Sequence, residues 1–191
     1  MYFILSILFI DVKFNSMLNN APAIFRFQAR LYQNPSKKHL LLDFPEEISR
    51  QFPSDKNSRI EGTLNDQPFR APLEPNTSGG HSLQVNKAMQ KNANVGDLVN
   101  LIILGPEPEL VIPDDLQAAL KNSPKANTFW KTLPSDIHRD WVRWIILAKQ
   151  APTRARRISR TIDQLLEQKR RPCCVNFYEF MLLRIEEDSN R

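Results

Sequence analysis

The sequence is poor in glycine and cysteine and contains no long apolar run. Only 5 of the 191 residues are glycine, which argues against a glycine-rich phosphate-binding loop. The 2 cysteines are adjacent, at Cys173 and Cys174, so a scaffold held by several disulfides is excluded. The 14 prolines instead predict many fixed corners between short elements. With 41% hydrophobic and 25% charged residues, the chain has the composition of a folded globular protein.

Residues 1–21 are expected to be an N-terminal extension. The apolar run over residues 2–10 is too short for a membrane span, which needs about 20 apolar residues. A secretory signal has basic residues before its apolar run, whereas the first basic residue here is Lys13. The extension is either spurious, with translation starting at Met17 instead of Met1, or a weak signal. The first interpretation predicts a cytoplasmic protein and the second a periplasmic one.

Residues 22–108 predict a small closed β-barrel. Apolar and polar residues alternate over residues 24–33, as in a half-buried strand. Asn65-Asp66 indicates a hairpin turn, and Pro68 and Pro72 predict that its second arm lies at an edge or bulge. Asn86 is expected to cap a short helix. Further strands are expected over residues 37–44, 59–64, 68–73, 83–85 and 98–104, with a helical turn at 45–48. Closure of these strands into a barrel would remove exposed edges.

Residues 109–175 change to a helical period and predict an α-helical bundle, so the expected fold class is α+β. Proline and capping residues predict helix starts near Asp114, Pro124, Ser135 and Ala151. Residues 176–191 are expected to form a tail, with a possible last helix over 177–185. The predicted buried stripe of the third helix is Ile137, Trp141, Trp144, Ile145 and Ala148. That of the fourth helix is Ala155, Ile158, Ile162, Leu165 and Leu166.

A cluster of polar residues in the predicted barrel is a candidate anion-binding site. Backbone amides in a glycine turn, an imidazole and basic side chains are groups that hold anions. The competing interpretation is structural: the glycines form a turn, and His81 and Asn86 satisfy buried backbone groups. The candidate ligand-binding residues are Arg70, Gly79, Gly80, His81, Asn86 and Lys87.

Basic residues are concentrated in one stretch of the chain. The net charge is +5, but residues 138–171 contain ten Lys or Arg and three acids, so this stretch carries +7 and the rest carries −2. Such a region attracts nucleic acid, anionic lipid or an acidic protein, although an ordinary solvated helix surface also carries arginine. The candidate docking face consists of Arg154, Arg156, Arg157, Arg160, Arg170 and Arg171.

The sequence offers no recognisable catalytic or metal-binding pattern. Its three histidines, His39, His81 and His138, lie far apart, and one cysteine pair does not complete a structural zinc site. No nucleophile elbow or Cys/His arrangement is present. We therefore expect no cofactor, no metal and no enzymatic activity.

Residues 135–174, SDIHRDWVRWIILAKQAPTRARRISRTIDQLLEQKRRPCC, resemble the C-terminal helical domain of the YdeI/OmpD-associated, or bacteriocin-protection, family. The strings FQARL, EGTLNDQPFRAPL, GGHSLQVNKAMQK and VGDLVNLIIL within residues 25–104 resemble the small β-barrel domain of unknown function that often precedes it. The resemblance implies a barrel followed by a helical bundle, a role in surviving bacteriocins, and contact with an outer-membrane porin. It supplies no catalytic residues.

These observations predict a non-enzymatic bacterial stress or bacteriocin-resistance protein that acts through protein or ligand binding. Two alternatives remain open: a module that binds nucleic acid or another polyanion through the arginine-rich helix, and a β-barrel that binds a small anion.

Overall fold

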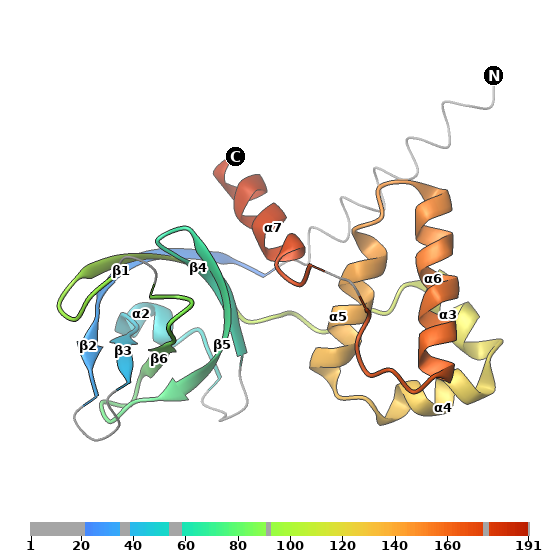
Figure 1. Ribbon diagram of the computed structural model, residues 1–191, viewed down its shortest axis with the longest axis horizontal. Helices are drawn as coiled ribbons and strands as arrows, with labels where there is room; N and C mark the ends of the chain where they lie inside the picture. The colour runs from blue at the N-terminus through green and yellow to red at the C-terminus, as the bar shows by residue number, and fades with distance from the viewer. Residues whose placement is uncertain (1–21, 35–38, 54–58, 91–92, 174–175, 191) are drawn as a thin grey trace. The chain divides into compact units, whose positions relative to one another are not determined.

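The computed structural model describes residues 22–34, 39–53, 59–90, 93–173 and 176–190. The predictions about residues 1–21 and about Cys174 lie outside these ranges. The chain divides into two compact units (Figure 1). The first contains Met1–Pro108 together with Met181–Arg191, and the second contains Glu109–Phe180. Each unit has its own hydrophobic core.

The first unit is built on a curled antiparallel sheet of seven strands in the order β1-β7-β4-β5-β6-β3-β2. Alternate side chains of each strand point into the curl and form the core. The short helix α2 (Glu46–Ser49), which was predicted as a helical turn, lies within the curl (Figure 1). The strands are β1 (Ile24–Arg30), β2 (Tyr32–Gln33), β3 (Leu40–Asp43), β4 (Arg59–Leu64), β5 (Gln67–Pro75), β6 (His81–Val85) and β7 (Leu98–Leu104).

The predicted closed barrel is wrong, because β1 and β2 are the two ends of the sheet and no ladder joins them in the described residues. The expected first strand bends at the buried Leu31, so its first part pairs with β7 and its second part with β3. Aromatic side chains bridge the open side: the ring centroids of Phe27 and Phe44 lie 5.1 Å apart, and those of Phe25 and Phe52 lie 6.1 Å apart. Side-chain packing therefore replaces backbone hydrogen bonds on this side.

The predicted hairpin between β4 and β5 is confirmed. Asn65 and Asp66 have φ angles of 44° and 63°, as a two-residue type I′ turn requires. Pro68 and Pro72 do not place β5 at the edge of the sheet, because β5 lies between β4 and β6. The register explains how the prolines are accommodated: both lie in the part of β5 that pairs only with β4, and β6 pairs with the last three residues of the strand.

The second unit consists of helices around a second apolar core. They are α3 (Asp114–Lys121), α4 (Pro124–Thr132), α5 (Ser135–Ile146) and α6 (Ala151–Leu166). The helix α7 (Glu179–Ser189) begins in this unit and continues into the first. The predicted stripe of α5 is confirmed for Ile137, Trp141, Trp144 and Ile145, which are buried, but Ala148 lies beyond the end of the helix and is half-buried. In α6 the prediction is only partly correct, because Leu165 is buried whereas Ala155 and Leu166 are exposed.

The helix α6 ends in a Schellman motif that reverses the chain. Gln168 has a left-handed φ of 58°. Its backbone N donates to Leu165 O at 3.0 Å, and Lys169 N donates to Gln164 O at 2.9 Å. The reversal leads the following residues back along the unit, where Arg170 O accepts a hydrogen bond from the indole of Trp141.

Replacing Gln168 with glycine is expected to stabilise the protein, because glycine adopts a left-handed φ without the clash of a Cβ. We expect Gln168→Gly to raise the free energy of unfolding by about 0.5–1 kcal/mol. Urea denaturation followed by circular dichroism measures the change. Gln117→Gly is the matched control, because Gln117 lies inside α3, where glycine is unfavourable and is expected to lower the stability. A lower stability for Gln168→Gly, or an equal gain in the control, contradicts the prediction.

Candidate functional site

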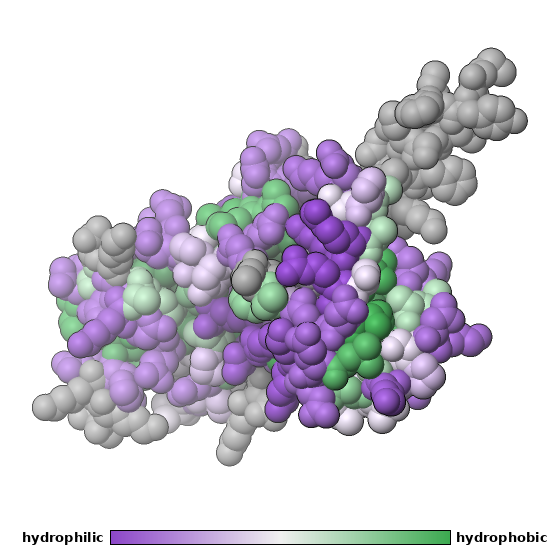
Figure 2. Space-filling view, turned by 45° about the vertical axis from the view of Figure 1, so that its right-hand side comes forward, coloured by the Kyte–Doolittle hydropathy of each residue, from purple (hydrophilic) through white to green (hydrophobic). Residues whose placement is uncertain are grey.

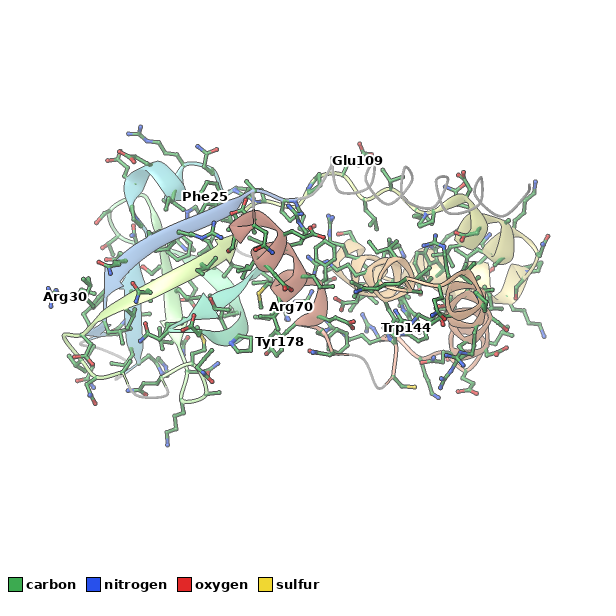
Figure 3. The ribbon with its side chains drawn as sticks, turned by 90° about the horizontal axis from the view of Figure 1, so that it is seen from above. Phe25, Arg30, Arg70, Glu109, Trp144 and Tyr178 are labelled. Carbon is green, nitrogen blue, oxygen red and sulfur yellow. The ribbon has the colours of Figure 1, made fainter. Side chains whose placement is uncertain are left out.

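The structure does not bring the candidate ligand residues together. Arg70 points away from the core, because its neighbours Phe69 and Ala71 point inward. It lies opposite Glu61 on β4, and its Nε is 3.0 Å from Glu61 Oε1, with both side chains largely buried (Figure 3). His81, by contrast, is 5% exposed and belongs to the inner face of β6. The two candidates for anion binding therefore lie on opposite faces of the sheet.

The remaining candidate ligand residues take part in turns. Gly79 has a φ of 82°, and the N of Gly80 donates to Asn76 Oδ1 at 2.8 Å. Asn86 Oδ1 accepts the backbone amides of Ala88 and Met89, as the predicted capping residue would, but residues 87–90 form a turn instead of the predicted helix. Lys87 is exposed. These roles agree with the structural interpretation, and anion binding by the set stays a prediction.

A buried hydrogen bond joins α2 to β6. Ser49 Oγ lies 2.7 Å from His81 Nδ1, and both residues are buried. The ring of Phe52 packs edge-on against the imidazole. A Cβ at position 80 would lie 3.2 Å from Ser49 Oγ, so Gly80 leaves room for the pair. Ser49 could not be predicted as a partner of His81, because it lies 32 residues earlier and belongs to a four-residue helix.

A second polar cluster surrounds Asp43 on the outer face of the same part of the sheet. Asp43 Oδ1 accepts hydrogen bonds from Ser82 Oγ at 2.5 Å and Tyr32 Oη at 2.9 Å. Asn76 Nδ2 is 3.5 Å from the same oxygen. Asp43 and Ser82 are register partners of β3 and β6, which explains why they meet. None of these residues is among the candidate ligand-binding residues of the sequence analysis.

The Tyr32 phenol gives this cluster a measurable pH dependence. Burial, and then the hydrogen bond to Asp43, raise the pKa of Tyr32 above its ordinary value of 10.0. Because the pKa is higher in the folded state, the stabilisation is fully present below pH 10 and is lost as the pH rises through the folded-state pKa. We expect Asp43→Asn to lower the Tyr32 pKa, measured by the ultraviolet absorbance of phenolate. Tyr32→Phe identifies the Tyr32 signal, and an unchanged titration in Asp43→Asn contradicts the prediction.

Two arginines of the predicted docking face are held by contacts within the second unit. Arg154 forms a bidentate salt bridge with Asp115, in which Nε donates to Oδ2 at 2.6 Å and Nη2 donates to Oδ1 at 2.9 Å. Burial opposes ionisation of Asp115, but Arg154 and backbone amides outweigh it and hold its pKa below the ordinary value. Arg157 donates to the carbonyl O of Trp144 at 2.5 Å, and its guanidinium lies 5.7 Å from the Trp144 ring centroid. These side chains stabilise helix packing.

Arg171 is also held, at the point where the chain returns to α5. Its guanidinium lies 3.3 Å from an oxygen of the buried Asp140 and 3.5 Å from an oxygen of Asp136. It also lies 5.9 Å from the ring centroid of Phe177. The sequence analysis missed these carboxylates, because their spacing on a helix gives no sign that one of them is buried.

Arg156, Arg160 and Arg170 of the docking face are exposed, and none of them forms an ion pair within the described residues. Arg156 and Arg160 are one helical turn apart on α6. The same helix face carries Asp163 and Glu167, so it is mixed in charge. Figure 2 shows a mainly hydrophilic surface with smaller apolar areas. A polyanion partner therefore stays a prediction.

The described residues contain no group of three or more His, Cys, Asp or Glu side chains placed to hold a metal ion. Within the same ranges, none of the helices has the length and apolarity needed to cross a membrane.

Comparison with known proteins assigns a family to both units. Residues 109–168 match the family model described as bacteriocin-protection, YdeI or OmpD-associated. Residues 27–102 match a domain of unknown function, DUF1905. A search of the curated proteins found no match. The two matched ranges follow the order of the sheet and helical units and together span more than half of the chain. The chain therefore contains a domain of the bacteriocin-protection, YdeI or OmpD-associated family, preceded by a DUF1905 domain.

Proposed function

We propose that this protein protects bacteria against bacteriocins or other antimicrobial peptides, and that it acts by binding and not by catalysis. The observation that carries the proposal is the match of the helical unit to the bacteriocin-protection family model. Three of the polar side chains considered as candidates have structural contacts instead. Arg154, Arg171 and His81 each pair with a residue of their own unit, as structural groups do.

The exposed arginines of the second unit supply the binding surface in this proposal. Arg156 and Arg160 lie one helical turn apart on α6 and are exposed, so they can reach an acidic partner. The family description also names association with OmpD, and we extend the proposal to a protein partner of that kind. We propose a cytoplasmic location. Contact with a mature outer-membrane protein would require a periplasmic one, and cell fractionation separates the two.

The direct test is deletion of the gene in its native host. The deletion strain is expected to become several-fold more sensitive to at least some members of a panel of bacteriocins and cationic peptides. A plasmid copy of the gene is expected to restore the wild-type sensitivity. Unchanged sensitivity across the whole panel refutes the proposed function.

A pair of charge-reversed variants tests the binding surface separately. Arg156→Glu with Arg160→Glu is expected to remove protection, because it reverses the charge of the two exposed side chains on α6. Lys125→Glu with Lys131→Glu is the matched control, since it makes the same charge change at exposed positions of α4 in the same unit. Equal protection by both double variants refutes the role of Arg156 and Arg160 but leaves the family function standing.

A further inference from the structure

Two buried apolar side chains of the first unit belong to neither hydrophobic core. Leu104 on β7 is 3% exposed and Met181 on α7 is 0% exposed, yet neither is a member of the sheet core or the helical core. Leu104 is on the outer face of the sheet, because its neighbour Ile103 points into the core. Both residues belong to the same compact unit. This indicates a second, smaller apolar layer on the outside of the sheet, covered by α7.

The strand register shows where this layer lies. Arg26 on β1 is the register partner of Ile102 on β7, and Ile102 is the partner of Thr63 on β4. The side chains of Arg26, Ile102 and Thr63 all point away from the sheet core, and Thr63 is nevertheless buried. We call the surface formed by these three residues and Leu104 the α7 face.

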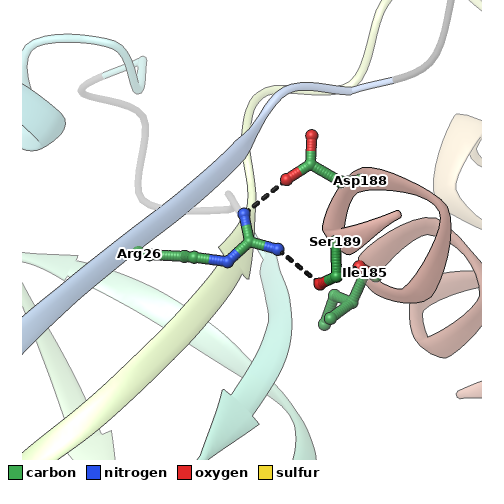
Figure 4. Close-up of polar contacts among 4 residues, drawn as sticks. All are labelled: Arg26, Ile185, Asp188 and Ser189. Carbon is green, nitrogen blue, oxygen red and sulfur yellow. Dashed lines mark hydrogen bonds and ion pairs between the residues drawn. The ribbon is translucent and has the colours of Figure 1, made fainter. Parts of the chain in front are cut away.

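Arg26 connects the α7 face directly to the helix. Its guanidinium pairs with Asp188 and donates to Ser189 Oγ at 3.0 Å (Figure 4). Figure 3 also shows α7 alongside these strands. The last turn of α7 is therefore attached to the middle of β1.

One buried side chain of α7 opposes docking. Arg184 is buried, but its salt bridge is to Glu187 of the same helix at 2.5 Å. Its Nε has no hydrogen-bond partner within the described residues. Burying a charged group that pairs within its own helix costs desolvation energy. This cost offsets part of the stabilisation that burial of Met181 and the contacts of Arg26 supply, which favours release of α7.

The helical structure of α7 itself depends on Arg26. The helix has 11 residues. Its last turn contains the acidic residues Glu187 and Asp188 and no basic residue, and Glu186 precedes it. Negative charge at a helix C-terminus is unfavourable, and a helix of this length is marginal in isolation. Arg26 supplies the missing positive charge from the sheet. Undocking and unfolding of α7 are therefore coupled.

We propose that the α7 face is a helix-docking surface and that α7 is its displaceable occupant. The surface selects a helix with an apolar side chain toward Leu104 and an acidic last turn toward Arg26. α7 lies outside both family-matched ranges, which end at residues 102 and 168, so it is an addition to the two domains that those models describe. The proposal does not depend on the proposed function.

Hydrogen–deuterium exchange of the full chain tests whether α7 opens locally. The amides of α7 are expected to exchange faster than those of β4 and β7, and Arg26→Glu is expected to speed their exchange several-fold further. Arg30→Glu is the matched control: it makes the same charge change on the same strand face, where Arg30 donates to Gly96 O. The double variant Arg26→Glu with Asp188→Arg is expected to restore protection. Exchange of α7 only through global unfolding, or an equal effect of both single variants, overturns the proposal.

A peptide added in trans tests whether the surface binds a helix. Met181→Asp is expected to release α7, whereas Leu182→Asp, at a position 40% exposed, leaves it docked. A synthetic peptide of residues 176–190 is expected to bind the Met181→Asp chain and not the Leu182→Asp chain. Adding Arg26→Glu to Met181→Asp is expected to abolish binding. Protection of the β4 and β7 amides checks that the sheet stays folded. Failure of the peptide to bind a folded chain with a released α7 overturns the proposal.

Discussion

Gly62→Ala is expected to destabilise the first unit severely. A Cβ at position 62 would lie 2.2 Å from Ile102 O and 2.9 Å from Ile103 Cα. Both are backbone atoms of β7, and Gly62 is the register partner of Ile103, so the clash is relieved only if β4 and β7 separate. Overpacking against backbone together with lost ladder bonds is expected to cost at least about 3 kcal/mol. Urea denaturation followed by near-ultraviolet circular dichroism measures this loss.

Gly79→Ala provides the comparison for this prediction. Gly79 has a φ of 82°, and a Cβ there would meet nothing within 4 Å. Gly79→Ala is therefore expected to lower the free energy of unfolding only by the strain of a left-handed backbone, about 1–2 kcal/mol. Equal stability of the two variants would contradict the argument, because it would show that β7 does not closely approach residue 62.

Trp141→Ala is expected to produce the largest loss in the second unit. Trp141 is fully buried, and its ring centroid lies 6.0 Å from that of Trp144. Its Nε1 donates to Arg170 O at 3.0 Å, which fastens the returning chain to α5. Truncation creates a cavity and removes this bond, so we expect a loss of about 3–5 kcal/mol. Thermal unfolding followed by far-ultraviolet circular dichroism measures it.

Two further variants separate packing from hydrogen bonding at this position. Trp141→Phe keeps a ring in the core but loses the indole donor, and is expected to cost about 1–3 kcal/mol. Leu166→Ala, at an exposed position of α6, is expected to change the stability by less than about 0.5 kcal/mol. If Trp141→Phe is as unstable as Trp141→Ala, the hydrogen bond and not the ring volume dominates.

The elements that were predicted correctly depend on signals contained within a few residues. Asn65-Asp66 has the side chains that tolerate positive φ, so it identified the hairpin. Pro124 at the start of α4 likewise marked a helix boundary. The open side of the sheet has no such local signal. Phe44 and Phe52 bridge it by meeting Phe27 and Phe25 of β1, and the alternation of apolar residues does not show that these rings meet.

The residues of the candidate site also divide into those with a local sequence signal and those whose contacts depend on tertiary packing. Gly79 and Asn86 occupy turns, as the structural interpretation of the sequence expected. The pairs that position the other polar groups join distant elements: 32 residues separate Ser49 from His81, and 39 separate Asp115 from Arg154. Such pairing is decided by tertiary packing, so the sequence alone could not predict which arginines stay exposed.

The bend at Leu31 has a consequence for the order of events during synthesis. β1 is the first strand to leave the ribosome, but its partner β7 follows about seventy residues later, after every other strand. Closing such a long loop is entropically costly and slow. Nascent β1 must therefore wait, with its edge available to chaperones, until Leu104 has emerged. The segment that shields Leu104 is translated later still.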